Sequence, residues 1–391
     1  METETEGDGV KRALIITSIG GFLPQFLKGD VRILRELGYE VHYASNFRYP
    51  VYRFSREELE QEGILLHQIP IRKSPVHLIA NLCALIRLIR LIRREQIDLV
   101  HCHNPVGGAI GRLAAALSGR EPVVLYTAHG FHFYQGAPLW YWGILYPVER
   151  MLAKRTDVLL TINREDAARA RRFRLRRGGF VRMLHGVGVD GDRFRPRPEI
   201  REEIRRKLEV PADAFHLVIA AELNDNKNHR VILEALHLLK DPGIRFSICG
   251  RGPNQEMLET RVDELGLSEQ VKLLGYRTDM PDVLQSADCF VFPSHREGFG
   301  IAAVEALTAG IPVIASDNRG TREYMVDGYN GLVCPADDVE AFAQAIRRMK
   351  EDTKLRLSCA QNAVRSAAPF LTKQTTNVMR EVYTAADRTR E

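Results

Sequence analysis

Short apolar runs recur along the chain, separated by longer stretches with the spacing of amphipathic helices. Runs rich in Val, Ile, Leu and Phe occupy residues 14–18, 41–44, 98–102, 123–128, 214–221, 246–249 and 289–292. Apolar residues at helical spacing follow several of them, for example at 23–37 and 78–97, and recur in the last segment, 372–388. Buried strands that alternate with helices are typical of parallel sheets with helices on their faces. The pattern therefore predicts an α/β chain.

One predicted strand leads into a loop suited to a phosphate group. The run 289–292 is followed by a turn containing Gly298, Phe299 and Gly300, and a helical pattern begins directly after Gly300. Exposed backbone amides and the positive end of a helix dipole favour a diphosphate at such a point. The three residues are therefore candidate donors of hydrogen bonds to a nucleotide diphosphate.

Two glutamates belong to the same segment. Glu297 lies in the loop, and Glu305 lies eight positions later, about one and a half turns into the helix. Both could then face the carboxyl end of the sheet, where open α/β folds bind ligands. Ionised carboxylates only accept hydrogen bonds, so they suit the vicinal hydroxyls of a hexose or a ribose. Taken alone, the spacing also fits two solvated glutamates.

The residues after this pair favour a binding site. The stretches 309–316, 320–323 and 327–333, taken with Glu297 and Glu305, resemble the donor-binding segment of retaining glycosyltransferases with the GT-B fold, in particular glycosyltransferase family 4. The resemblance covers nearly the whole chain after about residue 10. It implies two Rossmann-like domains facing a central cleft. It also implies that Glu297 contacts hydroxyls of the transferred sugar and that Glu305 contacts the ribose.

The resemblance assigns expected roles to further residues. Lys227 matches the lysine that contacts the donor diphosphate, whereas Glu222 stands where family members usually place an arginine. Arg251 is a possible substitute for that missing cation. The loop that contains Tyr276 is expected to frame the nucleotide base. His129 matches the amino-domain histidine that approaches the transferred sugar, so we expect His129, Lys227 and Glu297 to be the catalytic residues.

The amino-terminal half offers weaker signals. The first strand ends at Gly20 and Gly21, a nucleotide-binding arrangement, but the spacing G-x-G-x-x-G is missing and a dinucleotide cofactor is not supported. The sequence His101-Cys102-His103 invites a metal interpretation, although a structural zinc site needs four ligands and no second pair appears. We therefore expect no metal and no cofactor, and we interpret His103 as a hydrogen-bonding group on the acceptor side.

Composition fits an enzyme of two ordinary domains. The chain has 391 residues, 45% hydrophobic and 27% charged, with a formal net charge of +5. We place the amino-terminal domain at 1–200, the nucleotide-sugar domain at 201–371, and a helix that returns to the first domain at 372–391. The six cysteines lack paired short spacing, which favours reduced thiols. The acidic amino terminus is unlike a signal peptide, and no apolar stretch reaches the roughly 20 residues of a spanning helix.

Two arginine-bearing segments suggest an anionic surface as a partner. The segment 82–94 has an apolar helical stripe interrupted by Arg87, Arg90, Arg93 and Arg94, and a second cluster covers 169–177. An ordinary crossover helix with solvated arginines explains the first, and a solvated helix end explains the second. Both could also meet lipid headgroups. The segments 126–136, 146–150 and 161–166 resemble the bacterial branch that builds capsular and exopolysaccharide units on a lipid diphosphate carrier.

We therefore expect transfer of a sugar from a nucleotide sugar, and specifically from a UDP-sugar, to a polyprenyl-diphosphate saccharide. The protein should be cytoplasmic and attached to the inner face of the plasma membrane without spanning it, and nucleic acid is not an expected partner. Three alternatives stay open: a glycosyltransferase with a soluble acceptor, a nucleotide-sugar epimerase, and a sugar-nucleotide binding protein without activity.

Overall fold

A computed structural model describes residues 10–388 with the exception of 51 and 53. Their contacts divide the chain into two compact units: one runs up to Val187 and resumes at Lys373, and the other is Gly188–Thr372. The segment 188–200, which the sequence analysis placed in the first domain, thus belongs to the second unit. The reason is a strand-like pairing, in which Val189 N–H donates to Phe370 O at 2.9 Å and Thr372 N–H donates to Val189 O at 2.8 Å.

The first unit is built on a parallel sheet with the order β3-β2-β1-β4-β5-β6-β7. Its strands are β1 (Lys11–Ile16), β2 (Tyr39–Ser45), β3 (Leu65–Gln68), β4 (Leu99–His103), β5 (Val123–Ala128), β6 (Val158–Thr161) and β7 (Phe180–Met183). The central strands β4 and β5 are buried at every position, which explains their continuous apolar character.

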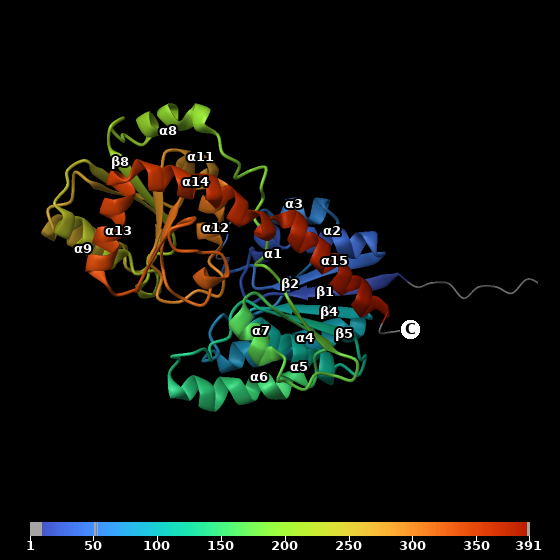
Figure 1. The fold of residues 1–391 in the computed structure, drawn as a ribbon. Coiled ribbons are helices and arrows are strands. Elements are labelled where there is room, and N and C mark those ends of the chain that lie inside the picture. The colour runs from blue at the N-terminus through green and yellow to red at the C-terminus, as the bar shows by residue number, and fades with distance from the viewer. Residues whose placement is uncertain (1–9, 51, 53, 389–391) are drawn as a thin grey trace, which may run out of the picture. The chain divides into compact units, whose positions relative to one another are not determined.

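Helices cover both faces of this sheet. They are α1 (Phe22–Phe26), α2 (Lys28–Glu36), α3 (Arg56–Gln61), α4 (Leu78–Arg94), α5 (Pro105–Leu117), a π-helical turn η1 (Tyr141–Leu145), α6 (Tyr146–Ala153), α7 (Arg164–Ala170) and α15 (Thr372–Arg388). Figure 1 shows α4, α5, α6 and α7 gathered on one side of the sheet, and their buried residues share one apolar core. The predicted helix 23–37 is divided in two, because Leu27 leaves helical geometry at φ −118° and ψ 15°.

The second unit has a parallel sheet with the order β10-β9-β8-β11-β12-β13. Its strands are β8 (Phe215–Ala220), β9 (Ile244–Cys249), β10 (Val271–Gly275), β11 (Cys289–Phe292), β12 (Val313–Ser316) and β13 (Gly331–Cys334). Phe290, Val291 and Phe292 lie opposite Val313, Ile314 and Ala315 in the register of β11 and β12. All four residues of β11 are buried, as its apolar run predicts.

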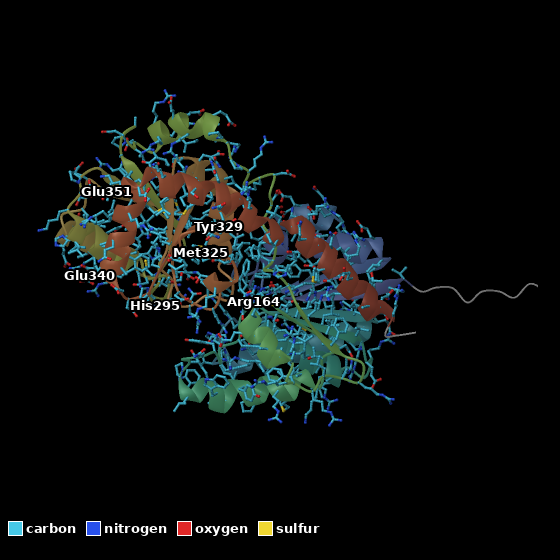
Figure 2. The ribbon with its side chains drawn as sticks, in the orientation of Figure 1. Arg164, His295, Met325, Tyr329, Glu340 and Glu351 are labelled. Atoms are coloured by element: carbon cyan, nitrogen blue, oxygen red, sulfur yellow. The ribbon has the colours of Figure 1, made fainter. Side chains whose placement is uncertain are left out.

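The helices of this unit are α8 (Arg201–Lys207), α9 (His229–Leu239), α10 (Gln255–Glu264), α11 (Met280–Gln285), α12 (Ile301–Thr308), α13 (Val339–Glu351) and α14 (Thr353–Ala367). Short 3₁₀ turns are η2 (Pro198–Ile200), η3 (Asp225–Lys227), η4 (Thr321–Glu323) and η5 (Ala368–Phe370). Helices α9 and α13 pack side by side (Figure 1), and Glu340 and Glu351 mark the two ends of α13 (Figure 2). The prediction of two Rossmann-like parallel sheets is confirmed.

Candidate active site

The strand order of the second sheet reverses between β8 and β11. Strands β9 and β10 lie on one side of β8, whereas β12 and β13 lie beyond β11. Open parallel sheets bind their ligands outside the carboxyl ends of the strands at such a reversal. The loops 221–228 and 293–300 leave the sheet there, one from each of the two central strands. Five of the donor-site residues predicted from the sequence lie on these two loops, namely Lys227, Glu297, Gly298, Phe299 and Gly300.

Lys227 and Glu297 meet between the two loops. Lys227 Nζ donates a hydrogen bond to Glu297 Oε1 at 2.5 Å and lies 5.5 Å from the centroid of the Phe292 ring. The lysine side chain is 21% exposed and the glutamate side chain 11%, so the pair is partly shielded from water. Such shielding strengthens a charge interaction relative to a fully exposed pair. The side chain of Asn224 accepts from Lys227 N–H at 3.2 Å and orders the turn that carries the lysine.

Backbone hydrogen bonds tie the two loops together. His295, labelled in Figure 2, donates its N–H to Asn226 O at 2.8 Å. The Asn226 side chain donates in turn to Arg296 O at 2.9 Å. From a third loop, Arg319 Nε donates to Glu297 O at 3.3 Å. These hydrogen bonds therefore fix the positions of the loops that carry the lysine and the glutamate.

Two glycines allow close packing around Glu297. Gly300, which precedes α12, has φ +89°, and a Cβ there would lie 2.7 Å from the Phe292 ring and 2.8 Å from the Tyr324 hydroxyl oxygen. That hydroxyl donates to Gly300 O at 3.1 Å. A Cβ on Gly320 would lie 2.7 Å from Glu297 Cβ. A side chain at either position would displace the loop, so glycine is required at both.

The loop before α12 can contact a ligand through backbone N–H groups but not through the Phe299 side chain. Phe299 is 5% exposed, and its ring centroid lies 5.4 Å from those of Tyr324 and Phe370. Within the part of the chain that the structure describes, the N–H groups of Phe299 and Gly300 donate to no acceptor. The aromatic ring anchors the loop, and the two amides stay available to an anion at the helix amino terminus.

Glu305 has a different environment from Glu297. It lies in the second turn of α12 and is partly buried, and loss of water around its carboxyl raises its pKa to about 7. The positive charge of Arg193 opposes that rise. Burial therefore favours the protonated form of Glu305, whereas Glu297 is paired with a cation.

The candidates on the neighbouring strands are more exposed. Arg251 follows β9 and is exposed, and its carbonyl oxygen accepts from Leu223 N–H at 3.0 Å, beside the exposed Glu222. Tyr276 follows β10 and is 45% exposed. The two loops are linked because Gly250 N–H donates to Gly275 O at 2.8 Å. Arg251 and Tyr276 thus lie at the same edge of the sheet as Lys227, on the side of β9 and β10.

In the first unit, the glycines after β1 permit close chain approach. A Cβ on Gly20 would lie 2.6 Å from Asn46 O, and one on Gly21, at φ +82°, would lie 2.2 Å from Tyr52 O. The close contacts are with backbone atoms, which cannot swing away as a flexible side chain could. Gly20 and Gly21 therefore have a structural reason to be glycine, apart from any contact with a donor.

His129 and His103 form a pair at the carboxyl ends of β5 and β4. His103 Nδ1 and His129 Nε2 are 3.2 Å apart, and the Phe22 ring centroid lies 5.1 Å from that of His129. Burial lowers the pKa of His129 to about 4 and that of His103 well below its ordinary value. Both rings are neutral at pH 7, so one donates and the other accepts. His103 is 1% exposed and contacts His129, and its assignment to the acceptor side stays a prediction.

A buried polar chain lies behind this pair. His101 Nδ1 is 2.7 Å from the Tyr383 hydroxyl of α15, and its Nε2 is 2.8 Å from Thr127 Oγ1. Burial lowers the pKa of His101 to about 3 and raises that of Asp30, a hydrogen-bond partner of Tyr383, to about 7. This network was not predicted from the sequence. The signal for it is the alternation in β4, where the buried residues 101 and 103 are both histidines.

The described part of the chain contains neither a metal-binding cluster nor a membrane-spanning helix. Among residues 10–388 other than 51 and 53, no three His, Cys, Asp or Glu side chains are placed to hold a metal ion. Over the same residues, no helix has the length and apolar character to cross a membrane. All six cysteines are free, and only Cys83 is exposed.

Comparisons with known proteins identify the family. Residues 31–191 match the model described as Glycosyltransferase Family 4, and residues 200–366 match the model described as Glycosyl transferases group 1. The putative glycosyltransferase EpsD of Bacillus subtilis (strain 168) is 39% identical over 383 residues, which cover 96% of this chain and 97% of that protein. The chain belongs to glycosyltransferase family 4.

A further relative and a solved structure are similar to most of this family 4 enzyme. The UDP-Gal:alpha-D-GlcNAc-diphosphoundecaprenol alpha-1,3-galactosyltransferase of Escherichia coli is 28% identical over 300 residues, covering 74% of this chain and 76% of that protein. The crystal structure of Anabaena HepE in complex with UDP-glucose superposes with a TM-score of 0.79 at 20% identity, covering 96% and 99% of the two chains. The expectations of a GT-B fold and of glycosyltransferase activity are confirmed.

Several residues of the site were not singled out from the sequence. Asn226, Arg319, Gly320 and Tyr324 contact the loop of Glu297 or brace it. Gly320 lies in a stretch that supported the family resemblance, so its position was visible but its role was not. Asn226 adjoins Lys227, and only the position of the neighbouring loop shows that it joins the two.

Proposed function

We propose that this family 4 enzyme transfers a sugar from a UDP-sugar, with retention of configuration, to a saccharide carried on a lipid diphosphate during surface-polysaccharide synthesis. The observation that carries the proposal is the Lys227–Glu297 pair at the strand-order reversal, beside the amino terminus of α12. The E. coli relative bears a name with a UDP-sugar donor and a diphosphoundecaprenol acceptor, and HepE was solved with UDP-glucose. Both names support the proposed substrates.

The proposed chemistry follows from the charges of the site. The Lys227 ammonium and the N–H groups of Phe299 and Gly300 would stabilise the diphosphate as it leaves. Glu297 would accept hydrogen bonds from hydroxyls of the transferred sugar, and Glu305 from the ribose. The bond from the anomeric carbon to the phosphate oxygen breaks, and the acceptor oxygen bonds to the same face of that carbon. The departing phosphate oxygen takes the acceptor's proton.

We further propose that His129 hydrogen-bonds the transferred sugar as a neutral imidazole, a role that the family resemblance implies. The low pKa of His129 and its contact with His103 support this role. Because the ring is neutral and its Nε2 contacts His103, the Nδ1 atom has a fixed hydrogen-bonding role and can contact the sugar. Arg251 is proposed as a second cation for the diphosphate in place of the arginine missing at Glu222.

Peripheral attachment to an anionic membrane surface is also part of the proposal. The start of α4 exposes Leu78, Ile79, Leu82 and Ile86 at 74%, 82%, 58% and 42%. Of the four arginines of this helix, Arg93 donates to Ser118 O and Leu117 O and Arg94 pairs with Glu95, which leaves Arg87 and Arg90 for headgroups. These exposed apolar residues support contact with a lipid surface better than the arginines do.

The test separates donor binding from turnover. UDP release is measured with a panel of nucleotide sugars, with and without a polyprenyl-diphosphate saccharide. Glu297→Gln should reduce turnover far more than UDP affinity, and Glu305→Ala should weaken UDP itself. The control is Glu340→Gln, at an exposed glutamate on α13. Near-normal turnover and UDP affinity in both site variants would refute the assignment.

The same assay distinguishes the alternatives. Release that depends on a water-soluble saccharide indicates a soluble acceptor. Epimerisation of the donor without an acceptor indicates an epimerase, and UDP-sugar binding without turnover indicates a binding protein.

A further inference from the structure

The helix formed by η1 and α6 turns an apolar face to solvent. Trp140, Ile144, Val148 and Met151 are 57%, 58%, 38% and 56% exposed. They are spaced by four, four and three residues, which is the spacing of one helix face. An ordinary surface helix presents polar residues on its outer side, so this orientation needs an explanation.

The orientation is held by buried contacts on the inner face. Glu149, 8% exposed, accepts from Arg112 Nη2 at 3.0 and 2.9 Å through its two carboxylate oxygens. The Arg112 guanidinium lies 3.9 Å from the centroid of the Tyr126 ring. Leu152 is buried on the same side of the helix. Rotating α6 to bury its apolar stripe would break this ion pair and leave two buried charges unpaired, which is unfavourable. The ion pair therefore keeps the stripe facing solvent.

A basic groove lies beside the apolar stripe. It has a volume of about 440 Å³ and lies between α6 and the chain that follows α7, lined by Tyr146, Pro147, Arg150, Met151, Lys154, Arg172 and Arg174. Its size is that of a small-ligand site.

The four cations of this groove have no carboxylate partner within the described ranges 10–50, 52 and 54–388. Neighbouring arginines do have one, since Arg169 pairs with Glu165 and Arg176 with Asp157. Unpaired cations around a concave surface repel one another and favour a bound anion.

The groove is separate from the catalytic edge of its unit. In a parallel sheet, each connecting helix runs back toward the amino ends of the strands. Arg150 and Lys154 end α6, and Arg172 and Arg174 follow α7, so the groove lies toward the amino edge of the sheet. His129 lies at the opposite, carboxyl edge. The groove is therefore distinct from the site around His129.

We propose that the groove binds the phosphate of an anionic phospholipid while the η1–α6 stripe lies among the acyl chains. The four cations match the charge of the headgroup, and the adjacent apolar face matches the lipid chains. A nucleic acid or a free phosphate ion would leave that apolar face exposed to water. This inference rests on the proposed function to the extent that an enzyme acting on a carrier lipid must reach a membrane. It adds a specific lipid site that the α4 surface does not include.

Vesicle flotation of the full chain tests the site, with phosphatidylcholine alone compared with phosphatidylcholine plus phosphatidylglycerol. The double variant Arg150→Gln/Lys154→Gln should bind the anionic vesicles about tenfold or more weakly, because each cation near an anionic surface contributes about fivefold. Ile144→Ser should also weaken binding, although it changes no charge. The control Lys354→Gln/Arg365→Gln removes two exposed cations from α14 and should bind as the parent does.

Equal loss in the groove variant and in the control would overturn the proposal, since net charge alone would then explain binding. Retention on heparin without binding to vesicles would also overturn it, in favour of a polyanion. So would a thermal shift of the parent by inorganic phosphate, lost in the groove variant, without vesicle binding. UDP binding by thermal shift should be the same in parent and groove variant, which shows that the variant folds. Absence of UDP binding in the parent would count against the proposed function and leave the lipid result intact.

Discussion

Replacing Lys227 by alanine removes a positive charge that lies against the Glu297 carboxylate. The lysine Nζ is 2.5 Å from Glu297 Oε1, and the loops that carry both residues are joined through Asn226. The variant therefore deletes a charge without deleting the framework. Two effects follow, one on turnover and one on stability, and they have different sizes.

The effect on turnover is expected to be the larger. Loss of one electrostatic stabiliser of a leaving group lowers the rate by about ten- to thousandfold, and the upper part of this range applies to dehydrated sites. Lys227 is 21% exposed, so solvent screens it only in part. The stability cost comes from leaving Glu297, 11% exposed, without its cation, and is about 1–3 kcal/mol.

The assay is UDP release under saturating donor, with unfolding by denaturant measured on the same samples. Lys350→Ala is the matched control, because Lys350 pairs with Asp241 in the same unit at 28% and 34% exposure. It should cost about 0–1 kcal/mol of stability and leave turnover unchanged. Turnover of Lys227→Ala within twofold of the parent would refute the reasoning. Arg251 would then be the first cation to test.

Three further outcomes are expected. UDP affinity, measured by calorimetry, should rise as the pH increases through about 7, because the ionised carboxylate of Glu305 accepts hydrogen bonds from the ribose more strongly than the protonated carboxyl does, and Glu305→Gln should lose this dependence. Gly320→Ala should lower turnover about tenfold or more by displacing Glu297. The control Gly143→Ala should leave turnover unchanged, because a Cβ there meets nothing within 4 Å. Equal activities of the two variants would show that the Glu297 loop accommodates the added methyl group. The pKa of His129 is about 4 in the folded protein against 6.5 ordinarily, so the unfolded chain binds more protons between these values. The free energy of unfolding should be fully retained above about pH 6.5 and fall toward pH 4, and a flat profile would contradict the burial argument.

The sequence was informative where chemistry depends on neighbours along the chain. The apolar run at 289–292, the glycines of the next loop and the helix after Gly300 form one continuous segment, and the structure has β11, a loop and α12 in that order. The last helix, predicted at 372–388, likewise has those bounds. Local periodicity suffices in both places because strand and helix formation are decided within a few residues.

The sequence was less informative where distant segments compete for one position. A single helix was predicted at 23–37, but the chain leaves helical geometry at Leu27. Residues 188–200 were grouped with the first domain, yet Val189 pairs with the chain at 370–372 in the second unit. The pairing of Val189 has no local signal, because its partner lies far along the chain.

By itself, the sequence determined the alternation of strands and helices, the family and the residue types available at the donor loops. Only the tertiary structure decided that Lys227 and Glu297, 70 positions apart, form an ion pair, since that contact requires β8 and β11 to be neighbours in the sheet. Tertiary structure also decided that His103 contacts His129 and that the apolar face of α6 points outward. The physical reason is the same in each case. Periodicity specifies which residues of a helix or strand share a face, and packing against the other elements decides what that face meets.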